Sequence, residues 1–230
     1  MDFHKNILHQ IAVISIILLA LISLSNGNLI EANLKITVER NGFHRSINYE
    51  IDIGKFAQNN CYVAINLHIP SSLYVNNDEL ADSERFGNIT ACSTGETDVE
   101  LFAEEAKSQE LTICNQFNNG INILNVMLHQ RYQRARDHES YVNVTLPNPK
   151  LLLGCRERIK EYPVSKINIC ESCAKLIYKW REIPFHMRSQ PYTWVIPVGK
   201  LSQRNYVTWI TLSACALGTI LVVKSLWHQN

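Results

Sequence analysis

The sequence lacks the marks of several large protein classes. Lys and Arg number 22 against 21 for Asp and Glu, so a formal net charge of +1 offers no general attraction for nucleic acid. Nine glycines and seven prolines form no low-complexity tract or flexible linker, and no internal repeat is present. We therefore predict no nucleic-acid partner, and one folded domain for most of the 230 residues.

Motifs of common catalytic and cofactor sites are also missing. The glycines form no dinucleotide-binding or P-loop motif and no G-x-S-x-G nucleophile elbow. No D-x-D pair is present to hold a divalent ion against a nucleotide-sugar diphosphate, and Asp82-Ser83-Glu84 is better explained as a solvated turn. The eight histidines show no H-E-x-x-H spacing, and a structural role is favoured for His44 and His68. The sequence thus predicts no catalytic residue, no cofactor and no metal ion.

The start of the chain is typical of a secretory signal peptide. A weakly basic beginning is followed by an uncharged apolar run from Ile11 to Leu24, which is too short to span a bilayer as a helix. Small residues precede a suitable cleavage point after Gly27. We predict that residues 1–27 are a signal peptide.

A second apolar segment lies near the end of the chain. Residues 207–223 carry no charge, with Trp209 and Trp227 near the two edges, where interfacial aromatic residues belong, and Lys224 directly after the segment. At about 1.5 Å per residue the segment spans about 26 Å as a helix, a length that suits the thin bilayer of the endoplasmic reticulum. We predict a transmembrane helix over residues 207–223.

A cleaved signal peptide and one C-terminal span predict a single-pass type I protein, with residues 28–206 lumenal and residues 224–230 cytosolic. N-glycosylation sequons at Asn88 and Asn143 agree with this orientation. Cys215 falls in the span, and the lumenal part holds an even number of cysteines: Cys61, Cys92, Cys114, Cys155, Cys170 and Cys173. We expect them to form structural disulfides, with all of the pairings open.

Alternation of apolar and polar residues predicts a mainly β domain. Residues 34–38 and 47–53 alternate on either side of Asn41-Gly42, which indicates a hairpin with a type I′ turn. Further strands are expected within residues 62–69, 121–128, 141–146 and 192–198, and short helices within residues 101–111 and 173–180. This spacing favours a single lumenal β-sandwich-like domain followed by one transmembrane helix.

The motif Cys170-Glu171-Ser172-Cys173 is the one arrangement with potential redox chemistry. A thioredoxin-type site follows an early strand of a βαβ unit, whereas this motif comes late in a β-rich chain with four further cysteines. We therefore favour structural disulfides, and keep a lumenal thiol oxidoreductase as an alternative.

Several short motifs, in their order along the chain, resemble the PIG-X family of the glycosylphosphatidylinositol (GPI) pathway. They are Gly42-Phe43-His44-Arg45, the stretch from Ile69 to Val75 with Glu79-Leu80, the sequon at Asn88, Arg131-Tyr132, Asn148-Pro149 followed by Leu151, Leu152 and Cys155, and Pro197-Val198-Gly199. The resemblance runs from about Asn41 to the apolar C-terminal segment. Residues 91–120 and 154–194 depart from the family pattern, so the resemblance implies no cysteine pairing.

The resemblance implies a non-catalytic, stabilising subunit of GPI mannosyltransferase I in the membrane of the endoplasmic reticulum. Its partner would be PIG-M, the multi-span catalytic subunit that adds the first mannose to the GPI precursor. Expected partner contacts are Tyr74 and the small-x-x-x-small pair Ala214 and Gly218. A type I receptor or adhesion ectodomain is the other alternative, although a tail of seven residues leaves no room for a signalling domain.

Overall fold

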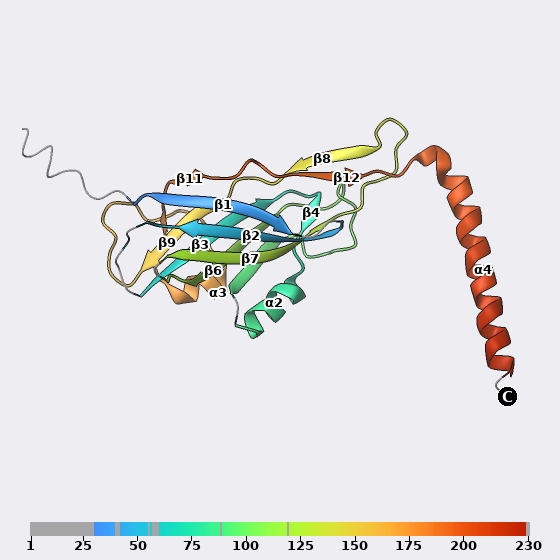
Figure 1. The fold of residues 1–230 in the computed structure, drawn as a ribbon, viewed down its shortest axis with the longest axis horizontal. Coiled ribbons are helices and arrows are strands. Elements are labelled where there is room, and N and C mark those ends of the chain that lie inside the picture. Colours follow the sequence, from blue (N-terminus) through green and yellow to red (C-terminus); the bar gives the residue numbers. More distant parts are fainter. Residues whose placement is uncertain are drawn as a thin grey trace, which may run out of the picture.

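The computed structural model describes residues 30–39, 42–54, 56, 60–87, 89–118 and 120–228. The predicted signal peptide and the sequon residue Asn88 lie outside the described residues. Within them, the chain folds into two five-stranded sheets, a two-stranded sheet and a long C-terminal helix that projects away from the sheets (Figure 1). The predicted fold class, mainly β with one apolar C-terminal helix, is confirmed.

The first sheet has the strand order β11-β1-β2-β7-β4. Its strands are β1 (Ala32–Glu39), β2 (His44–Asp52), β4 (Leu73–Tyr74), β7 (Ile121–Gln130) and β11 (Phe185–Met187). β11 runs parallel to β1, and the other neighbours are antiparallel. An edge strand from late in the sequence therefore completes a sheet that begins at the start of the described chain.

The hairpin predicted around Asn41-Gly42 is formed by β1 and β2. Val38 pairs with Ile47, so the turn is centred one residue later than a type I′ turn at Asn41-Gly42 requires. Gly42 still adopts a positive φ of 100°. Both registers place apolar residues opposite each other on the same face, so the apolar pattern determines which face is buried but not which residues pair.

The second sheet has the order β10-β9-β3-β6-β5, with β3 at its centre and antiparallel pairing throughout. Its strands are β3 (Cys61–Ile69), β5 (Thr90–Gly95), β6 (Gln109–Gln116), β9 (Lys150–Cys155) and β10 (Arg181–Glu182). The helix predicted within residues 101–111 is wrong, because residues 101–108 form turns and loop and β6 begins at Gln109. Leu111 and Ile113 are fully buried between the sheets, and this burial outweighs the helix propensity of the segment.

The hydrophobic core lies between the two sheets. Both sheets contribute fully buried aliphatic side chains to one cluster, including Leu34, Ile47, Ile51, Leu124 and Leu128 from the first and Val63, Ile65, Leu67, Leu151 and Leu153 from the second. The alternation that predicted strands thus also defines the inner faces of a β-sandwich.

Two helices contact the second sheet, one at its β5 edge and the other on its outer face. α2 (Asn77–Arg85) contacts β5 and begins with Asn76, whose side-chain oxygen accepts a 2.9 Å hydrogen bond from the Asp78 amide. The predicted turn at Asp82-Ser83-Glu84 is therefore wrong, since these residues continue a capped helix. α3 (Glu171–Leu176) lies within the expected helical region 173–180 only in part.

A small outer core holds α3 to the second sheet. Ile177 and Trp180 follow α3 and pack with Ala64 and Leu152 of the strands. Gly154 of β9 makes this approach possible, because a Cβ atom there would lie 2.7 Å from the Cγ2 atom of Ile177. The outer face of the second sheet is thus partly covered by a segment with little regular structure.

The chain leaves the sandwich through a two-stranded sheet. β8 (Tyr141–Thr145) and β12 (Thr193–Pro197) pair in an antiparallel arrangement, close to the predicted strands. The 3₁₀ helix η1 (Leu201–Gln203) and the helix α4 (Arg204–His228) follow. The stretch Leu201–Trp227 is long and apolar enough to cross a membrane and has none of its most apolar window buried.

α4 extends beyond both ends of the predicted span, residues 207–223, and is about 37 Å long at about 1.5 Å per residue. Helix length therefore does not distinguish a thin bilayer from a thick one. Ala214, Cys215 and Gly218 lie in the middle of α4, and all three are exposed.

Candidate partner-binding site

Several of the family-like motifs meet at one end of the sandwich. The segment Gly42–Arg45 leads into β2, and the segment Ile69–Val75 contains β4. The Gln130 amide, at the end of β7, donates a 3.0 Å hydrogen bond to the Phe43 carbonyl, and the next amide, of Arg131, donates one of 2.9 Å to the Ser72 carbonyl. Motifs that are far apart in the sequence thus form one site around the end of β7.

His129 is the centre of this site, with only 3% of its surface exposed. Its Nε2 atom lies 2.7 Å from a carboxylate oxygen of Glu79 in α2. The Tyr74 ring stacks on the imidazole with 4.9 Å between centroids, and the His44 ring meets it edge-on at 4.4 Å. The Nδ1 atom of His129 is buried without a hydrogen-bond partner. We call His44, Tyr74, Glu79 and His129 the histidine cluster.

Arg131 supports the cluster from the end of β7. Its guanidinium group is buried, lies 4.8 Å from the centroid of the Tyr74 ring and donates a 2.7 Å hydrogen bond to the Asp98 carbonyl. Burial raises the pKa of the Tyr74 hydroxyl, an effect that the Arg131 charge opposes and Glu79 reinforces. Tyr74 is half-buried between His129 and Arg131, so its contacts in this structure hold the cluster together.

A buried tryptophan joins the two-stranded sheet to the same end of the sandwich. Trp194 of β12 is fully buried, and its indole N–H donates a 2.7 Å hydrogen bond to the side-chain oxygen of Gln130. The Arg45 guanidinium lies 4.4 Å from the centroid of the indole ring and also donates a hydrogen bond to the Tyr192 hydroxyl. β12 is therefore fixed to the first sheet by specific polar contacts as well as by apolar packing.

Three exposed aromatic side chains lie on segments next to the cluster and form what we call the aromatic patch: Phe43, Phe102 and Tyr132. The rings of Phe43 and Tyr132 lie 5.3 Å apart, and the Ala103 amide donates a hydrogen bond to the Tyr132 carbonyl. Tyr132 is 68% exposed. Exposed aromatic residues that lie close together are typical of protein-binding surfaces.

Figure 1 shows β4 at the end of the sandwich from which the chain leaves toward α4. The Arg136 amide donates a 2.9 Å hydrogen bond to the Gly199 carbonyl. The side chain of Asp137 accepts a 2.8 Å hydrogen bond from the Ser202 amide in η1, and this bond lowers the pKa of the Asp137 carboxyl. These bonds hold the segment after Tyr132 against the start of the apolar helix.

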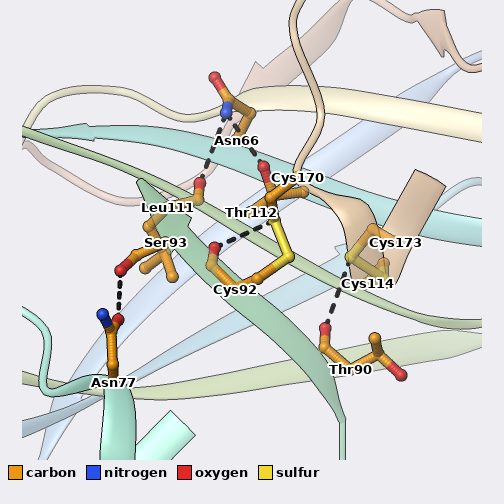
Figure 2. The surroundings of a disulfide bond; sticks show 10 residues. All are labelled: Asn66, Asn77, Thr90, Cys92, Ser93, Leu111, Thr112, Cys114, Cys170 and Cys173. Atoms are coloured by element: carbon orange, nitrogen blue, oxygen red, sulfur yellow. Dashed lines mark hydrogen bonds between the residues drawn. A yellow bond between two sulfur atoms is a disulfide. The ribbon is translucent and has the colours of Figure 1, made fainter. Parts of the chain in front are cut away.

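The six cysteines outside α4 form three disulfides, and each disulfide includes at least one cysteine of the second sheet. Cys61 and Cys155 are paired residues of β3 and β9. Figure 2 shows the other two bonds, Cys92–Cys170 and Cys114–Cys173, which attach the α3 segment to β5 and β6. The two cysteines of the C-x-x-C motif thus bond to different strands, whereas a redox motif needs them to pair with each other. This connectivity supports structural bridges over thiol oxidoreductase chemistry.

We expect one free thiol per chain. Alkylation of the denatured, unreduced protein should label only Cys215 on α4, and labelling after reduction should reach all seven cysteines. Peptide mapping without reductant should recover Cys170 and Cys173 linked to different peptides. A peptide with Cys170 bonded to Cys173 would contradict this connectivity.

The other predicted site residues do not join this site. Asn143 is exposed on β8, paired with Val195 in the two-stranded sheet, so its side chain is accessible for glycosylation. Ala214 and Gly218 lie on α4, away from the sandwich. Sequence reasoning missed His129 and Trp194, because nothing near either residue in the sequence signals its partners. The one local signal was that His129 precedes the Arg131-Tyr132 motif by two residues.

The fold and the site define a class of protein: a disulfide-linked β-sandwich domain, with an aromatic surface at one end, joined to one apolar helix long enough to cross a membrane. The sequence profile of the PIG-X / PBN1 family matches residues 40–227, and the chain belongs to this family. The predicted resemblance is thereby confirmed.

Similar proteins include mammalian members with a stated role. The chain is 25% identical over 214 residues to a human protein named GPI alpha-1,4-mannosyltransferase I, stabilizing subunit, with 87% of this chain and 81% of the human protein covered. A rat protein of the same name is 25% identical over 205 residues, with 83% of this chain and 80% of the rat protein covered. A mouse protein of that name is also 25% identical.

Proposed function

We propose that this protein is the non-catalytic, stabilising subunit of GPI mannosyltransferase I. The observation that carries the proposal is the family match over residues 40–227, together with relatives named as the stabilizing subunit of that enzyme. Its partner is a PIG-M-like multi-span catalytic subunit. The pair serves the step that adds the first mannose to the GPI precursor in the endoplasmic reticulum.

The architecture supports a single-pass type I protein of the endoplasmic reticulum membrane. α4 supplies one apolar helix of sufficient length, and residues 1–27 have the composition of a signal peptide. Three disulfides and the exposed sequon residue Asn143 fit a lumenal, oxidising environment for the sandwich. Residues 28–206 are then lumenal, and residues 224–230 are cytosolic.

A stabilising role requires binding but no chemistry of its own. A subunit that binds only the folded form of its partner stabilises that form by about 2.7 kcal/mol when its concentration is about 100 times the dissociation constant. Without the subunit, a larger fraction of the partner unfolds and is degraded. The subunit then controls how much catalytic protein is present in the membrane.

Position in the fold favours the aromatic patch as one contact with the catalytic subunit. The patch is linked through Arg136 and Asp137 to the start of α4, so in a type I protein it lies near the membrane surface, where lumenal loops of a multi-span protein are found. Tyr74, which stacks on His129 in the neighbouring cluster, is half-buried and contributes its exposed part. Within the membrane, the small residues Ala214 and Gly218 allow another helix to approach α4 closely.

Variants of the two surfaces should separate binding from folding. Tyr132→Glu and Gly218→Leu should each lower the amount of catalytic subunit that co-purifies with the full-length protein, because one places a charge in an apolar contact and the other blocks close helix packing. Matched controls are Tyr178→Glu, since Tyr178 is 94% exposed outside the patch, and Ala216→Leu on the opposite side of α4. Tyr74→Asp is a less specific probe, because it also breaks the stacking on His129.

Equal recovery of the catalytic subunit with all four variants and the unchanged protein would exclude both surfaces. Loss of binding only with Tyr132→Glu, or only with Gly218→Leu, would assign the contact to the lumenal domain or to the helix, respectively.

The function itself is tested by deleting the gene for this chain in its own cell. We expect loss of GPI-anchored proteins from the cell surface and a lower level of the multi-span transferase, both restored by re-expression. Normal anchors with a normal transferase level would contradict the proposal. Display of this chain on the surface of intact cells would then favour the receptor or adhesion alternative.

A further inference from the structure

We propose that His44, Glu79 and His129 form a binding site for a zinc ion. The three residues come from separate elements: His44 begins β2, Glu79 lies in the first turn of α2, and His129 is next to last in β7. Each offers one ligand atom, and all three atoms lie within 4.8 Å of one another. Among the described residues, this is the one group of three histidine, cysteine or acidic side chains whose ligand atoms lie this close together.

The donor set fits zinc better than the other common divalent ions. Two imidazoles and one carboxylate are a known zinc ligand set, whereas calcium and magnesium prefer oxygen ligands alone. Zinc ligands lie about 2.0–2.2 Å from the ion, so in a tetrahedral site they are about 3.4 Å apart. The Nε2 atom of His129 lies 2.7 Å from the Glu79 carboxylate and all three ligand atoms lie within 4.8 Å of one another, so a short movement of the exposed His44 side chain would complete the approach.

The imidazole ring of His129 is held in one orientation by its neighbours. Tyr74 stacks on one side of its ring, His44 meets it edge-on, and the residue is almost wholly buried. Its Nε2 atom lies 2.7 Å from the Glu79 carboxylate, so the two groups already point toward a common position.

Glu79 is also fixed in place. Its turn of α2 is capped by Asn76, and Asn77 at the start of the helix accepts a 2.5 Å hydrogen bond from the Ser93 hydroxyl of β5. The carboxylate is therefore presented by a helix that is attached to the second sheet, while the two histidines belong to the first. A zinc ion would join both sheets at this end of the sandwich.

The surrounding charge favours a cation. Both Glu79 and Glu100 act electrostatically on Tyr74 within the cluster. Arg131 is the opposing charge, and its Nη1 atom is directed to the carbonyl oxygens of Asp98 and Leu101. His44 is exposed and directly follows Phe43 of the aromatic patch, so the site is accessible from solvent.

Zinc binding is tested on the full-length protein in detergent, freed of metal and titrated with zinc against a chromogenic zinc indicator. We expect one zinc ion per chain, with an affinity at least about tenfold weaker in His44→Ala and in Glu79→Gln. Cobalt should occupy the same site and show the visible absorption of a tetrahedral complex. His68→Ala is the matched control, because His68 and Glu110 form an exposed pair at 2.6 Å without a second histidine.

Thermal unfolding gives an independent measure. Zinc should raise the Tm of the unchanged protein and of His68→Ala but not that of His44→Ala, with each protein compared with its own Tm without metal. Absence of zinc binding would overturn the proposal. Equal zinc affinity in all of the variants would also overturn it, because the ion would then bind elsewhere. These outcomes are independent of the role in GPI synthesis.

Discussion

Replacing Trp194 with alanine is expected to lower the free energy of unfolding by about 3–5 kcal/mol, because the change removes a fully buried indole from the core. The loss is not only one of volume. The side-chain oxygen of Gln130 loses the hydrogen bond that it accepts from the indole N–H. The Arg45 guanidinium loses the ring against which it packs. β12 should then separate from the first sheet, and the link between the sandwich and α4 should loosen.

Val195→Ala is the control for this prediction, since Val195 is the next residue of β12 and is 49% exposed. Its effect should stay within about 0.5 kcal/mol. Urea unfolding followed by circular dichroism measures both variants without relying on tryptophan fluorescence. Similar stabilities for Trp194→Ala and Val195→Ala would show that β12 is not anchored through the indole.

Loss of the disulfide between Cys61 and Cys155 should destabilise the whole sandwich. The bond joins the central strand β3 to β9 across a sequence separation of 94 residues. A cross-link of this span removes about 4–5 kcal/mol of chain entropy from the unfolded state. Cys61→Ser with Cys155→Ser should therefore unfold the domain at a much lower urea concentration, and the yield of folded protein should fall.

The bond between Cys114 and Cys173 provides the comparison. It attaches α3 to the outer face of the second sheet, so Cys114→Ser with Cys173→Ser should expose the α3 segment to protease while the sandwich core survives. Fragment mapping after limited proteolysis distinguishes the two double variants. Early cleavage throughout the sandwich in the α3 variant, or a fully protected core in the Cys61 variant, would contradict this assignment.

Much of the fold could be predicted from the sequence because its signals are local. An apolar period of two residues is visible in β1, β2 and β7, and α4 shows as an uncharged apolar run. β6 was missed, since its segment begins among good helix formers and becomes a strand only because Leu111 and Ile113 pack against the opposite sheet. The sequence did not predict α2, because its acidic composition is typical of a solvated loop. The helix is stabilised by the cap at Asn76.

The candidate site was accessible only in part. The family-like motifs contain Phe43, His44, Tyr74, Glu79 and Tyr132, but nothing in the sequence states that they meet. Contact between Glu79 and His129 spans 50 positions, and the contact between Arg45 and Trp194 depends on how β12 packs against the first sheet. The cysteine pairing was undetermined for the same reason, since it depends on strand order.

The parallel pairing of β1 with β11 constrains the order of events during synthesis. β1 begins at Ala32, only a few residues after the predicted signal cleavage point, yet its edge partner Phe185–Met187 leaves the ribosome after every other strand of the first sheet. The first sheet cannot be completed by cotranslational folding from the N-terminus alone. Only sixteen residues separate Met187 from the start of α4, so the sheet closes at about the time this helix emerges. Chaperones that retain the incomplete domain would therefore act until the apolar helix is available, which links completion of the sandwich in time to insertion of its anchor.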